Sequence, residues 1–338
     1  MNIIDQSSEL GSITIIGSGS WGTALALQLS AKQYIVKVWG RNSAYIETIN
    51  KNRENKQYLP GIKLPENIQF FSNLKESIQD SDVVLIATPS KGFRNILINL
   101  KALGSEFDIC WATKGFEVDT GLLPHNICEE IFGQNQNMAV ISGPSFAAEV
   151  AQKKPTAVTV ASNNLNFSKH IASSLSDINF RAYTTKDITG VEIGGAIKNI
   201  IAIGAGISDG LHYGDNARIA LINRGLVEMQ RLGVSLGADK NTFLGLSGMG
   251  DLVLTCTSDL SRNRRFGLAI AKGNSISKAR SDINQVIEGI DATAAVFRLS
   301  KKMNIKMPIC KTISRIIFED LKPSLAVEEL MSRDLQTE

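Results

Sequence analysis

Three glycines with the spacing G-x-G-x-x-G stand near the start of the chain, at Gly17, Gly19 and Gly22. They follow a run of β-branched residues over 13–16 and precede a run rich in Ala and Leu, which predict a buried strand and a helix. In such a turn the first glycine permits the sharp bend, the second lets the backbone approach a pyrophosphate, and the third lets helix and strand pack closely. The helix N-terminus then faces the anion. The stretch predicts a dinucleotide-binding turn.

A second chemical group lies in the middle of an apolar helical stretch. Over residues 192–206 the pattern predicts a helix that is apolar on all sides and therefore buried, with Lys198 and Asn199 as polar interior residues. Because an unpaired buried lysine is costly, Lys198 must line a cavity or pair with an acid such as Glu192 or Asp251. Burial also lowers the pKa of a lysine toward the working pH, which suits a general acid. We therefore expect Lys198 to be catalytic.

Arg41 follows the predicted strand over 34–39, where an NAD-selective site usually has an acid that holds the ribose 2′-hydroxyl. Its guanidinium could pair with a 2′-phosphate, stack on adenine, or remain in solvent. We interpret Arg41 as a sign that NADPH is accepted, and NADH use stays open.

Two further strand ends carry polar groups. Lys114 follows the strand over 108–112, where a lysine can hold a carbonyl or phosphate oxygen or can simply be solvated. Gly143-Pro144 forces a turn after the strand over 138–141, and Ser145 then offers a hydroxyl and N–H groups at a helix start.

The C-terminal half carries acids that could bind polar groups. Asp251 follows a glycine-rich bend and is placed to cap the next helix, and Thr255 shares its helix face four residues later. Glu288 could accept a hydrogen bond from a cofactor amide or ribose, or it could be an ordinary acid at a helix end.

A cluster of hydrogen-bond donors lies over 261–265, between Thr255 and Glu288. Arg262 and Asn263 could form a bidentate donor set for a phosphate, beside the hydroxyl of Ser261. Arg264 and Arg265 are expected on a solvated face.

These groups must be positioned by two kinds of secondary structure. Predicted strands alternate with helices up to residue 186, and the pattern is helical from residue 187 onward. The expected strands lie at 13–16, 34–39, 68–71, 82–87, 108–112, 138–141, 156–161 and 179–183, so that the last two extend the sheet past six. We expect an α/β fold with a Rossmann-type dinucleotide-binding domain over 1–188 and an all-helical substrate-binding domain over 189–338.

Composition excludes several classes of protein. The 338 residues are 43% hydrophobic and 20% charged with a net charge of +3, which is too mild to indicate nucleic acid binding. The four dispersed cysteines read as buried thiols of a reducing compartment, and the three histidines lack a metal-ligand spacing, so that no metal is expected. We expect no membrane span and no signal peptide, because no apolar run approaches the length of a span, and hence a cytoplasmic location.

Several fragments taken together resemble the bacterial NAD(P)-dependent glycerol-3-phosphate dehydrogenases. In chain order, between about residues 11 and 330, the matching fragments are GSGSWGTALA, ATKG, SGPSFAAE, GGAIKNIIAIGAGISDG, GMGDLVLTC, SRNRRFG and VIEGI. The resemblance implies reversible reduction of dihydroxyacetone phosphate to sn-glycerol 3-phosphate with NADPH or NADH, which supplies the backbone of glycerophospholipids. It also implies that Lys198 is the proton donor or acceptor.

The resemblance further implies two sets of contacts. The implied substrate contacts are Lys114, Gly143, Ser145, Lys198, Asp251, Ser261, Arg262 and Asn263, with Asn199 and Thr255 at further substrate positions. The implied cofactor contacts are Ser20, Trp21, Arg41, Lys114, Ala147, Arg262, Val286 and Glu288, beside the three glycines of the turn.

Two other functions are weighed against this one. A 3-hydroxyacid or ketopantoate type of dehydrogenase also combines these two domains with a lysine, but its carboxylate substrate needs no dianion site such as Arg262-Asn263. A nucleotide-sensing regulator without catalysis predicts loss of Lys198 or Asp251, and both are present. The amphipathic tail over 324–335 could be a packing helix or part of a homodimer contact.

Overall fold

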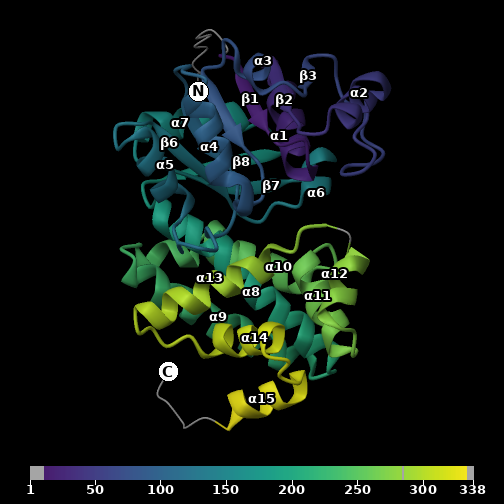
Figure 1. The fold of residues 1–338 in the computed structure, drawn as a ribbon, viewed down its shortest axis with the longest axis vertical. Coiled ribbons are helices and arrows are strands. Elements are labelled where there is room, and N and C mark those ends of the chain that lie inside the picture. Colours follow the sequence, from purple (N-terminus) through teal and green to yellow (C-terminus); the bar gives the residue numbers. More distant parts are fainter. Residues whose placement is uncertain (1–10, 284, 333–338) are drawn as a thin grey trace.

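The computed structural model describes residues 11–283 and 285–332. Figure 1 shows a sheet with its flanking helices above a cluster of helices. The strands are β1 (Ile13–Ile16), β2 (Val36–Trp39), β3 (Ile68–Phe71), β4 (Val83–Ile86), β5 (Asp108–Trp111), β6 (Met138–Ser142), β7 (Thr156–Ser162) and β8 (Phe180–Thr185). The helices of this half are α1 (Ser20–Ala31), α2 (Ser43–Asn52), α3 (Leu74–Ile78), η1 (Ser90–Gly92), α4 (Phe93–Ala102), α5 (Pro124–Phe132), α6 (Ala147–Ala151) and α7 (Leu165–Leu175).

Everything described after β8 is helical. These elements are α8 (Ile188–Gly210), α9 (Gly214–Ser235), η2 (Lys240–Leu244), η3 (Leu246–Gly250), α10 (Asp251–Thr257), α11 (Arg262–Ala271), α12 (Ile276–Ile283), α13 (Glu288–Lys302), α14 (Pro308–Phe318) and α15 (Pro323–Met331). The predicted change from alternating strands and helices to helices alone is confirmed. Part of the amphipathic tail, from residue 333, lies outside the described residues.

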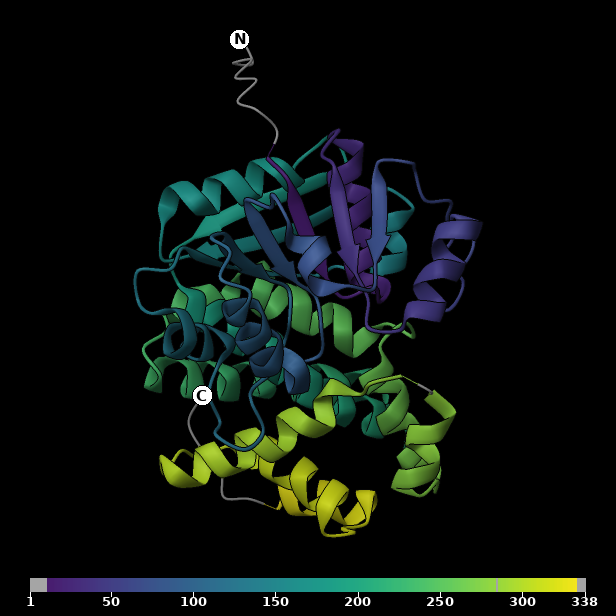
Figure 2. The same ribbon diagram turned by 45° about the horizontal axis from the view of Figure 1, so that its top comes forward.

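Eight strands of the described chain form one sheet in the order β3-β2-β1-β4-β5-β6-β7-β8. All neighbouring strands are parallel except β6 and β7, and β1 pairs with both β2 and β4. The strand order therefore reverses at β1, which makes the crevice outside the carboxyl ends of β1 and β4 the expected dinucleotide site. Figure 2 shows the strands running toward the helical half, so this crevice faces it. The expected sheet of more than six strands is confirmed.

Burial explains why the strands were recognisable from sequence. Every residue of β1 and β4 is buried, as in parallel strands that are covered on both faces. One face of the sheet packs on side chains such as Leu25 and Phe167, from α1 and α7. The other face packs on Phe93 and Ile127, from α4 and α5.

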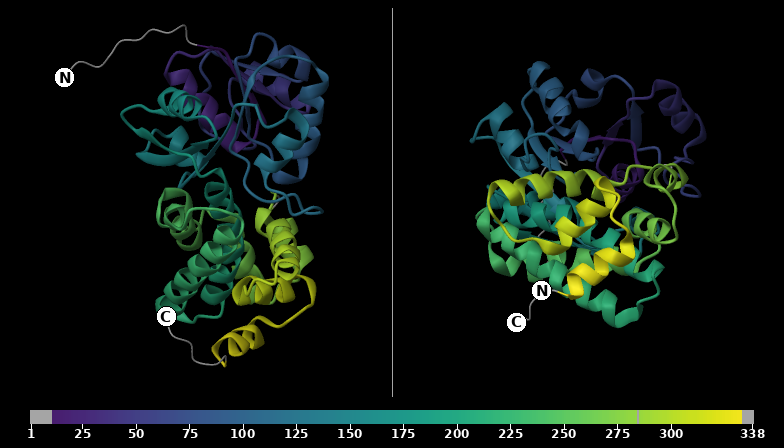
Figure 3. Two further views of the ribbon diagram at one scale, coloured as in Figure 1. Left: turned by 90° about the vertical axis from the view of Figure 1, so that its left-hand side faces the viewer. Right: turned by 60° about the horizontal axis from the view of Figure 1, so that its bottom comes forward.

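α8 is the central element of the helical half (Figure 1, Figure 3). Of its 23 residues, 20 are buried, as the apolar pattern predicted. Its glycines allow α11 to pack very closely, because a Cβ on Gly206 would lie 1.9 Å from the carbonyl oxygen of Arg264. A Cβ on Gly267 would likewise lie 2.0 Å from that of Ile203. The first turn of α11, which carries Arg262 and Asn263, is thus held against α8.

α8 also corrects one expectation about membranes. Its length and composition would suffice to cross a membrane, so the statement that no apolar run approaches this length is wrong. All of its apolar window is buried inside the protein, as in the core helix of a globular domain.

The sequence predicts that Ser43 caps the helix after the second strand and that residues 51–65 form a loop over the sheet edge, and both expectations need correction. Asn42, rather than Ser43, caps α2, because its side chain accepts the N–H of Tyr45 at 3.0 Å. The segment over 51–65 is less open than a loop, because α2 extends to Asn52 and an isolated bridge joins Glu54 to Lys63.

Candidate active site

The glycine-rich turn has the geometry that a dinucleotide needs. Gly17 has φ +126°, and a Cβ there would lie 2.7 Å from the carbonyl oxygen of Ala87. A Cβ on Gly22 would lie 2.0 Å from the carbonyl oxygen of Gly17, which explains the close packing of α1 on the turn. A Cβ on Gly19 would meet none of the described atoms within 4 Å, so this side of the turn is open. The open cradle at the N-terminus of α1 fits the pyrophosphate of NAD(P).

Residues near this turn include three of the expected cofactor contacts. The Ser20 hydroxyl donates to the carbonyl oxygen of Tyr58 at 2.7 Å, and Trp21 is half-buried beside it on α1. Arg41 lies just beyond β2 with an exposed side chain. An exposed guanidinium can pair with a 2′-phosphate, stack on adenine or remain in solvent, so the structure does not decide between these three interpretations.

The centre of the candidate site is one carboxylate that holds two lysines. Lys114, from the end of β5, places its Nζ 2.6 Å from Oδ2 of Asp251, and Lys198 from α8 donates to Oδ1 of the same carboxylate. Lys114 Nζ also donates to the carbonyl oxygen of Gly143 at 3.3 Å. Asp251 is 1% exposed and Lys198 is 8% exposed. The structure therefore joins the sheet half and the helical half through two buried charges, Asp251 and Lys198, and the partly buried ammonium of Lys114.

These contacts decide between the expected partners of Lys198. The acid is Asp251, because Glu192 instead accepts from Trp111 Nε1 at 3.0 Å and pairs with the ring of His125 at 2.5 Å. The expectation that Asp251 caps a helix is wrong. Its carboxylate accepts hydrogen bonds from Lys114 and Lys198 instead, and among the described residues no side chain caps α10.

Burial and charge shift the pKa values in this cluster. Burial and the neighbouring Lys114 lower the pKa of Lys198 and the Asp251 carboxylate raises it, and the net result is a pKa of about 8. Burial alone would raise the pKa of Asp251, but the ammonium groups of Lys114 and Lys198 outweigh this effect and hold it below its ordinary value. Lys198 can therefore exchange a proton near neutral pH, while Asp251 stays ionised.

A network of buried amides extends from Asn199, the residue after Lys198, toward α11 and α13. Asn199 Oδ1 accepts from Asn263 Nδ2 at 2.8 Å, and Asn263 Oδ1 accepts the N–H of Gly289 at 3.0 Å. Asn199 Nδ2 donates to Glu288 Oε2 at 3.3 Å. The network brings an expected cofactor residue, Glu288, next to two expected substrate residues.

The first turn of α11 lies beside this network. Ser261 caps the helix by accepting the N–H of Arg264 at 3.2 Å, and Arg262 is half-buried. The expectation that Arg264 is solvated is wrong, because its side chain is 12% exposed and ion-paired with Asp209 at 2.6 Å. Arg265 is exposed as expected.

The remaining expected residues lie around this cluster. Thr255 donates from its hydroxyl to the backbone oxygen of Asp251 at 2.6 Å, and Ser145 donates to the carbonyl oxygen of Gly143 at 3.1 Å. Ala147 begins α6, so Ser145 precedes the helix rather than starting it. Val286 is 47% exposed, two residues before α13.

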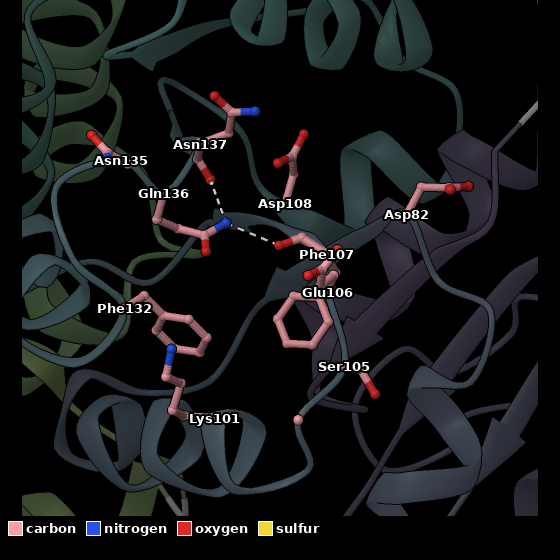
Figure 4. Close-up of a pocket in the computed structure, with 11 residues that line it drawn as sticks. Asp82, Lys101, Ser105, Glu106, Phe107, Asp108, Phe132, Asn135, Gln136 and Asn137 are labelled. Atoms are coloured by element: carbon pink, nitrogen blue, oxygen red, sulfur yellow. Dashed lines mark hydrogen bonds between the residues drawn. The ribbon is translucent and has the colours of Figure 1, made fainter.

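A separate hollow lies away from this cluster. It has a volume of about 710 Å³ and lies at the amino ends of β4, β5 and β6. Figure 4 shows the side chains that line it, among them Lys101, Asp108 and Gln136. Ligands of open α/β sheets bind at the carboxyl ends of the strands, where the lysines and the glycine-rich turn lie. We therefore place the site at the opposite edge from this hollow.

The sheet order, the open glycine-rich turn and the helical half with its lysine pair define a two-domain NAD(P)-dependent dehydrogenase. Residues 12–168 match the model of the N-terminus of NAD-dependent glycerol-3-phosphate dehydrogenase. Residues 187–328 match the model of its C-terminus. The chain belongs to the NAD-dependent glycerol-3-phosphate dehydrogenase family.

Individual relatives match over nearly their whole length. Glycerol-3-phosphate dehydrogenase [NAD(P)+] of Psychromonas ingrahamii is 45% identical, covering 96% of this chain and 98% of the relative. The enzyme of the same name from Aeromonas hydrophila is 44% identical with the same coverage of both chains. The crystal structure of glycerol-3-phosphate dehydrogenase from Coxiella burnetii has a TM-score of 0.93 at 45% identity, covering 96% of this chain and 99% of that one. The expected family and the NAD(P) cofactor are thus confirmed.

Proposed function

We propose that this chain reduces dihydroxyacetone phosphate reversibly to sn-glycerol 3-phosphate and so supplies the backbone of glycerophospholipids. The observation that carries the proposal is the buried Asp251 carboxylate between Lys114 and Lys198. It keeps a buried proton donor charged, at the junction of the nucleotide-binding half and the helical half. The alternatives to this proposal are a hydroxyacid or ketopantoate type of dehydrogenase and a regulator without catalytic activity.

The chain's residues would hold the cofactor at the glycine-rich turn and along the crevice. When bound, the dihydronicotinamide supplies a hydride to the ketone carbon. We assign the cofactor contacts to Gly17, Gly19, Ser20, Trp21, Gly22, Arg41, Lys114, Ala147, Arg262, Val286 and Glu288.

The proton then comes from Lys198. As the ketone oxygen gains negative charge, the Lys198 ammonium donates to it, and Asp251 favours the ammonium form until the transfer. Lys114 from this cluster and Asn199, the next residue after Lys198, would stabilise the developing oxyanion with N–H groups that donate to Asp251 and Glu288 in the absence of substrate. In the oxidation direction the neutral Lys198 amine takes the proton back.

The phosphate would be bound at the start of α11. Arg262 and Asn263 supply guanidinium and amide donors there, and the α11 N-terminus favours an anion. Gly143, Ser145, Asp251, Thr255 and Ser261 complete the substrate contacts that we propose. Binding the phosphate away from the reacting carbon orients the ketone, so this binding energy contributes to catalysis.

The test compares substrates with and without the phosphate. NAD(P)H oxidation is followed with dihydroxyacetone phosphate, unphosphorylated dihydroxyacetone and a 2-oxoacid, and we expect the first to be preferred strongly. The Arg262→Ala variant should lower kcat/KM for dihydroxyacetone phosphate about 10- to 100-fold and leave the slow reaction with dihydroxyacetone almost unchanged. Equal losses on both substrates with intact NADPH binding would place the phosphate elsewhere. Preference for the 2-oxoacid would overturn the proposal.

We further propose that the protein works in the cytoplasm as a homodimer. All four cysteines are buried free thiols, which suits a reducing compartment. The C-terminal helix α15 exposes Leu325 and Met331, apolar side chains that a second copy could cover. Light scattering coupled to size-exclusion chromatography gives the mass, and a monomer at micromolar concentration would rule out the dimer.

A further inference from the structure

A single asparagine fastens the segment between α2 and β3 to the glycine-rich turn. Asn55 is fully buried, and its amide makes three hydrogen bonds. Nδ2 donates to the carbonyl oxygen of Ser18 at 2.9 Å and to the hydroxyl of Thr23 at 2.8 Å. Oδ1 accepts from the hydroxyl of Tyr45 at 2.6 Å. Both amide protons and the carbonyl oxygen are thus engaged.

The three partners of Asn55 belong to elements around the proposed cofactor position. Ser18 lies within the glycine-rich turn, and Thr23 lies in the first turn of α1. Tyr45 lies in the first turn of α2, where its N–H is held by the cap residue Asn42. Asn42 directly follows Arg41, the residue expected at the ribose 2′-position. Asn55 therefore connects the pyrophosphate end of the site with its adenosine end.

A second set of contacts holds the segment that carries Asn55. The Ser20 hydroxyl donates to the carbonyl oxygen of Tyr58, and the N–H of Gln57 donates to the Tyr45 hydroxyl at 3.0 Å. The rings of Tyr45 and Tyr58 meet edge to face, with centroids 6.0 Å apart. Glu54 accepts the N–H of Gly61 at 2.9 Å. These contacts hold residues 54–61 in a fixed position against the glycine-rich turn, and we call this segment the brace.

We propose that Asn55 is a positioning residue for the dinucleotide, which it aligns without touching. It fixes the glycine-rich turn relative to the first turn of α2, so that the N–H groups at the start of α1 and the Arg41 side chain meet one ligand at the right separation. This inference rests on the proposed placement of the cofactor at these residues. Preorganised groups bind more tightly because less ordering is needed on binding.

The main test measures dinucleotide affinity in the absence of any other substrate. Asn55→Ala removes all three hydrogen bonds, and Asn55→Asp replaces the amide N–H groups with a carboxylate oxygen that faces the Ser18 carbonyl oxygen, which can only accept. We expect both variants to raise the Kd for NADPH and for NADH by about 10-fold or more. The KM for dihydroxyacetone phosphate at saturating NADPH should change less than twofold. Calorimetry or NADPH fluorescence gives the Kd, whichever substrate the enzyme reduces.

A matched control separates positioning from general stability. Asn67 also makes three side-chain hydrogen bonds, to Ser30 and to the carbonyl oxygen of Tyr34, at the amino edge of the sheet. Asn67→Ala should lower Tm by an amount similar to Asn55→Ala and leave both Kd values unchanged. An unchanged Kd in Asn55→Ala, or an equal rise in both alanine variants, would overturn the proposal.

If Asn55→Ala does not fold, a milder variant tests whether the Asn55 contacts affect dinucleotide affinity. Tyr45→Phe removes one hydroxyl and keeps the ring contact with Tyr58. It should raise both dinucleotide Kd values by about three- to tenfold, the effect of one lost hydrogen bond. A folded Tyr45→Phe protein with ordinary dinucleotide affinity would contradict the proposed role.

Discussion

Replacing Asp251 with asparagine tests the proposed proton transfer most directly. Asp251 is the acid that holds both Lys114 and Lys198, and burial, this acid and Lys114 together bring the pKa of Lys198 to about 8. Asparagine keeps the size of the side chain and removes its charge. Lys198 then faces the positive charge of Lys114 without a compensating carboxylate, so its ammonium form is destabilised.

The size of the effect follows from Coulomb's law. One opposite charge at about 4 Å, with an effective dielectric constant of about 20, contributes about 4 kcal/mol. At about 1.4 kcal/mol per pH unit, its loss moves the protonation equilibrium of Lys198 by about three pH units toward acid. At pH 7 about nine in ten Lys198 side chains are protonated in the wild type, and about one in a hundred in the variant. The kcat for ketone reduction should therefore fall about 100-fold at pH 7.

The assay is the pH profile of kcat for reduction of dihydroxyacetone phosphate. In Asp251→Asn, kcat should rise about tenfold for each pH unit as the pH is lowered from 7, because the ammonium form returns. Asp209→Asn is a suitable control, since Asp209 is partly buried in a different ion-pair cluster with Arg218 and Arg264. It should lower stability without moving the profile. A variant that keeps near-normal turnover at pH 7, or loses activity equally at all pH values, would refute Lys198 as the proton donor.

Three other outcomes are expected. Lys198→Met should lower kcat by about 100-fold or more while the Kd for NADPH, measured by fluorescence, changes little. Arg41→Asp should raise the KM for NADPH about tenfold more than that for NADH, and equal changes would show that Arg41 does not meet a 2′-phosphate. Burial lowers the pKa of His125, but the Glu192 carboxylate outweighs it and raises the pKa above 6.5. This pair therefore stabilises the fold fully below that pH and less as pH rises through the folded-state pKa, so urea melts should show His125→Gln destabilised more at pH 6 than at pH 9.

Much of the fold could be predicted because its signals are local. β1 and β4 are buried on both faces, so they appear in the sequence as continuous apolar runs. α8 is buried on all sides, so it appears as a long stretch that is almost without charged residues. Helix caps were harder, because Asn42 and Ser43 are both good capping residues and adjacent in the chain. Which one caps depends on where the backbone leaves the extended region, and a helix boundary is uncertain by a residue or two.

Charge pairing was the part that local patterns could not decide. Glu192 and Asp251 were equal candidates for Lys198, although six residues along a helix correspond to one and two-thirds turns, which puts Glu192 on a different face from Lys198. That geometry was available in the sequence and disfavours Glu192. The pairing with Asp251, 53 residues away, depends on how η3 and α10 return to α8. The brace around Asn55 was also missed, because a polar segment with two prolines looks like an open loop.

The charge count of the central cluster connects this geometry to the substrate. Lys114 and Lys198 share one carboxylate, so these three groups carry a net charge of +1, and this remains +1 when the Glu288 carboxylate, which also acts on Lys198, is set against the Arg262 guanidinium. Buried charge without a counter-ion is unfavourable, and an arriving anion relieves it. A neutral triol or ketone would leave this charge uncompensated. A phosphorylated ketone would compensate it and, in the binding mode proposed above, would present its carbonyl to Lys198. The net positive charge therefore favours an anionic, phosphorylated substrate, as the resemblance to the family also does. The Arg262→Ala comparison tests the contribution of one of these positive charges.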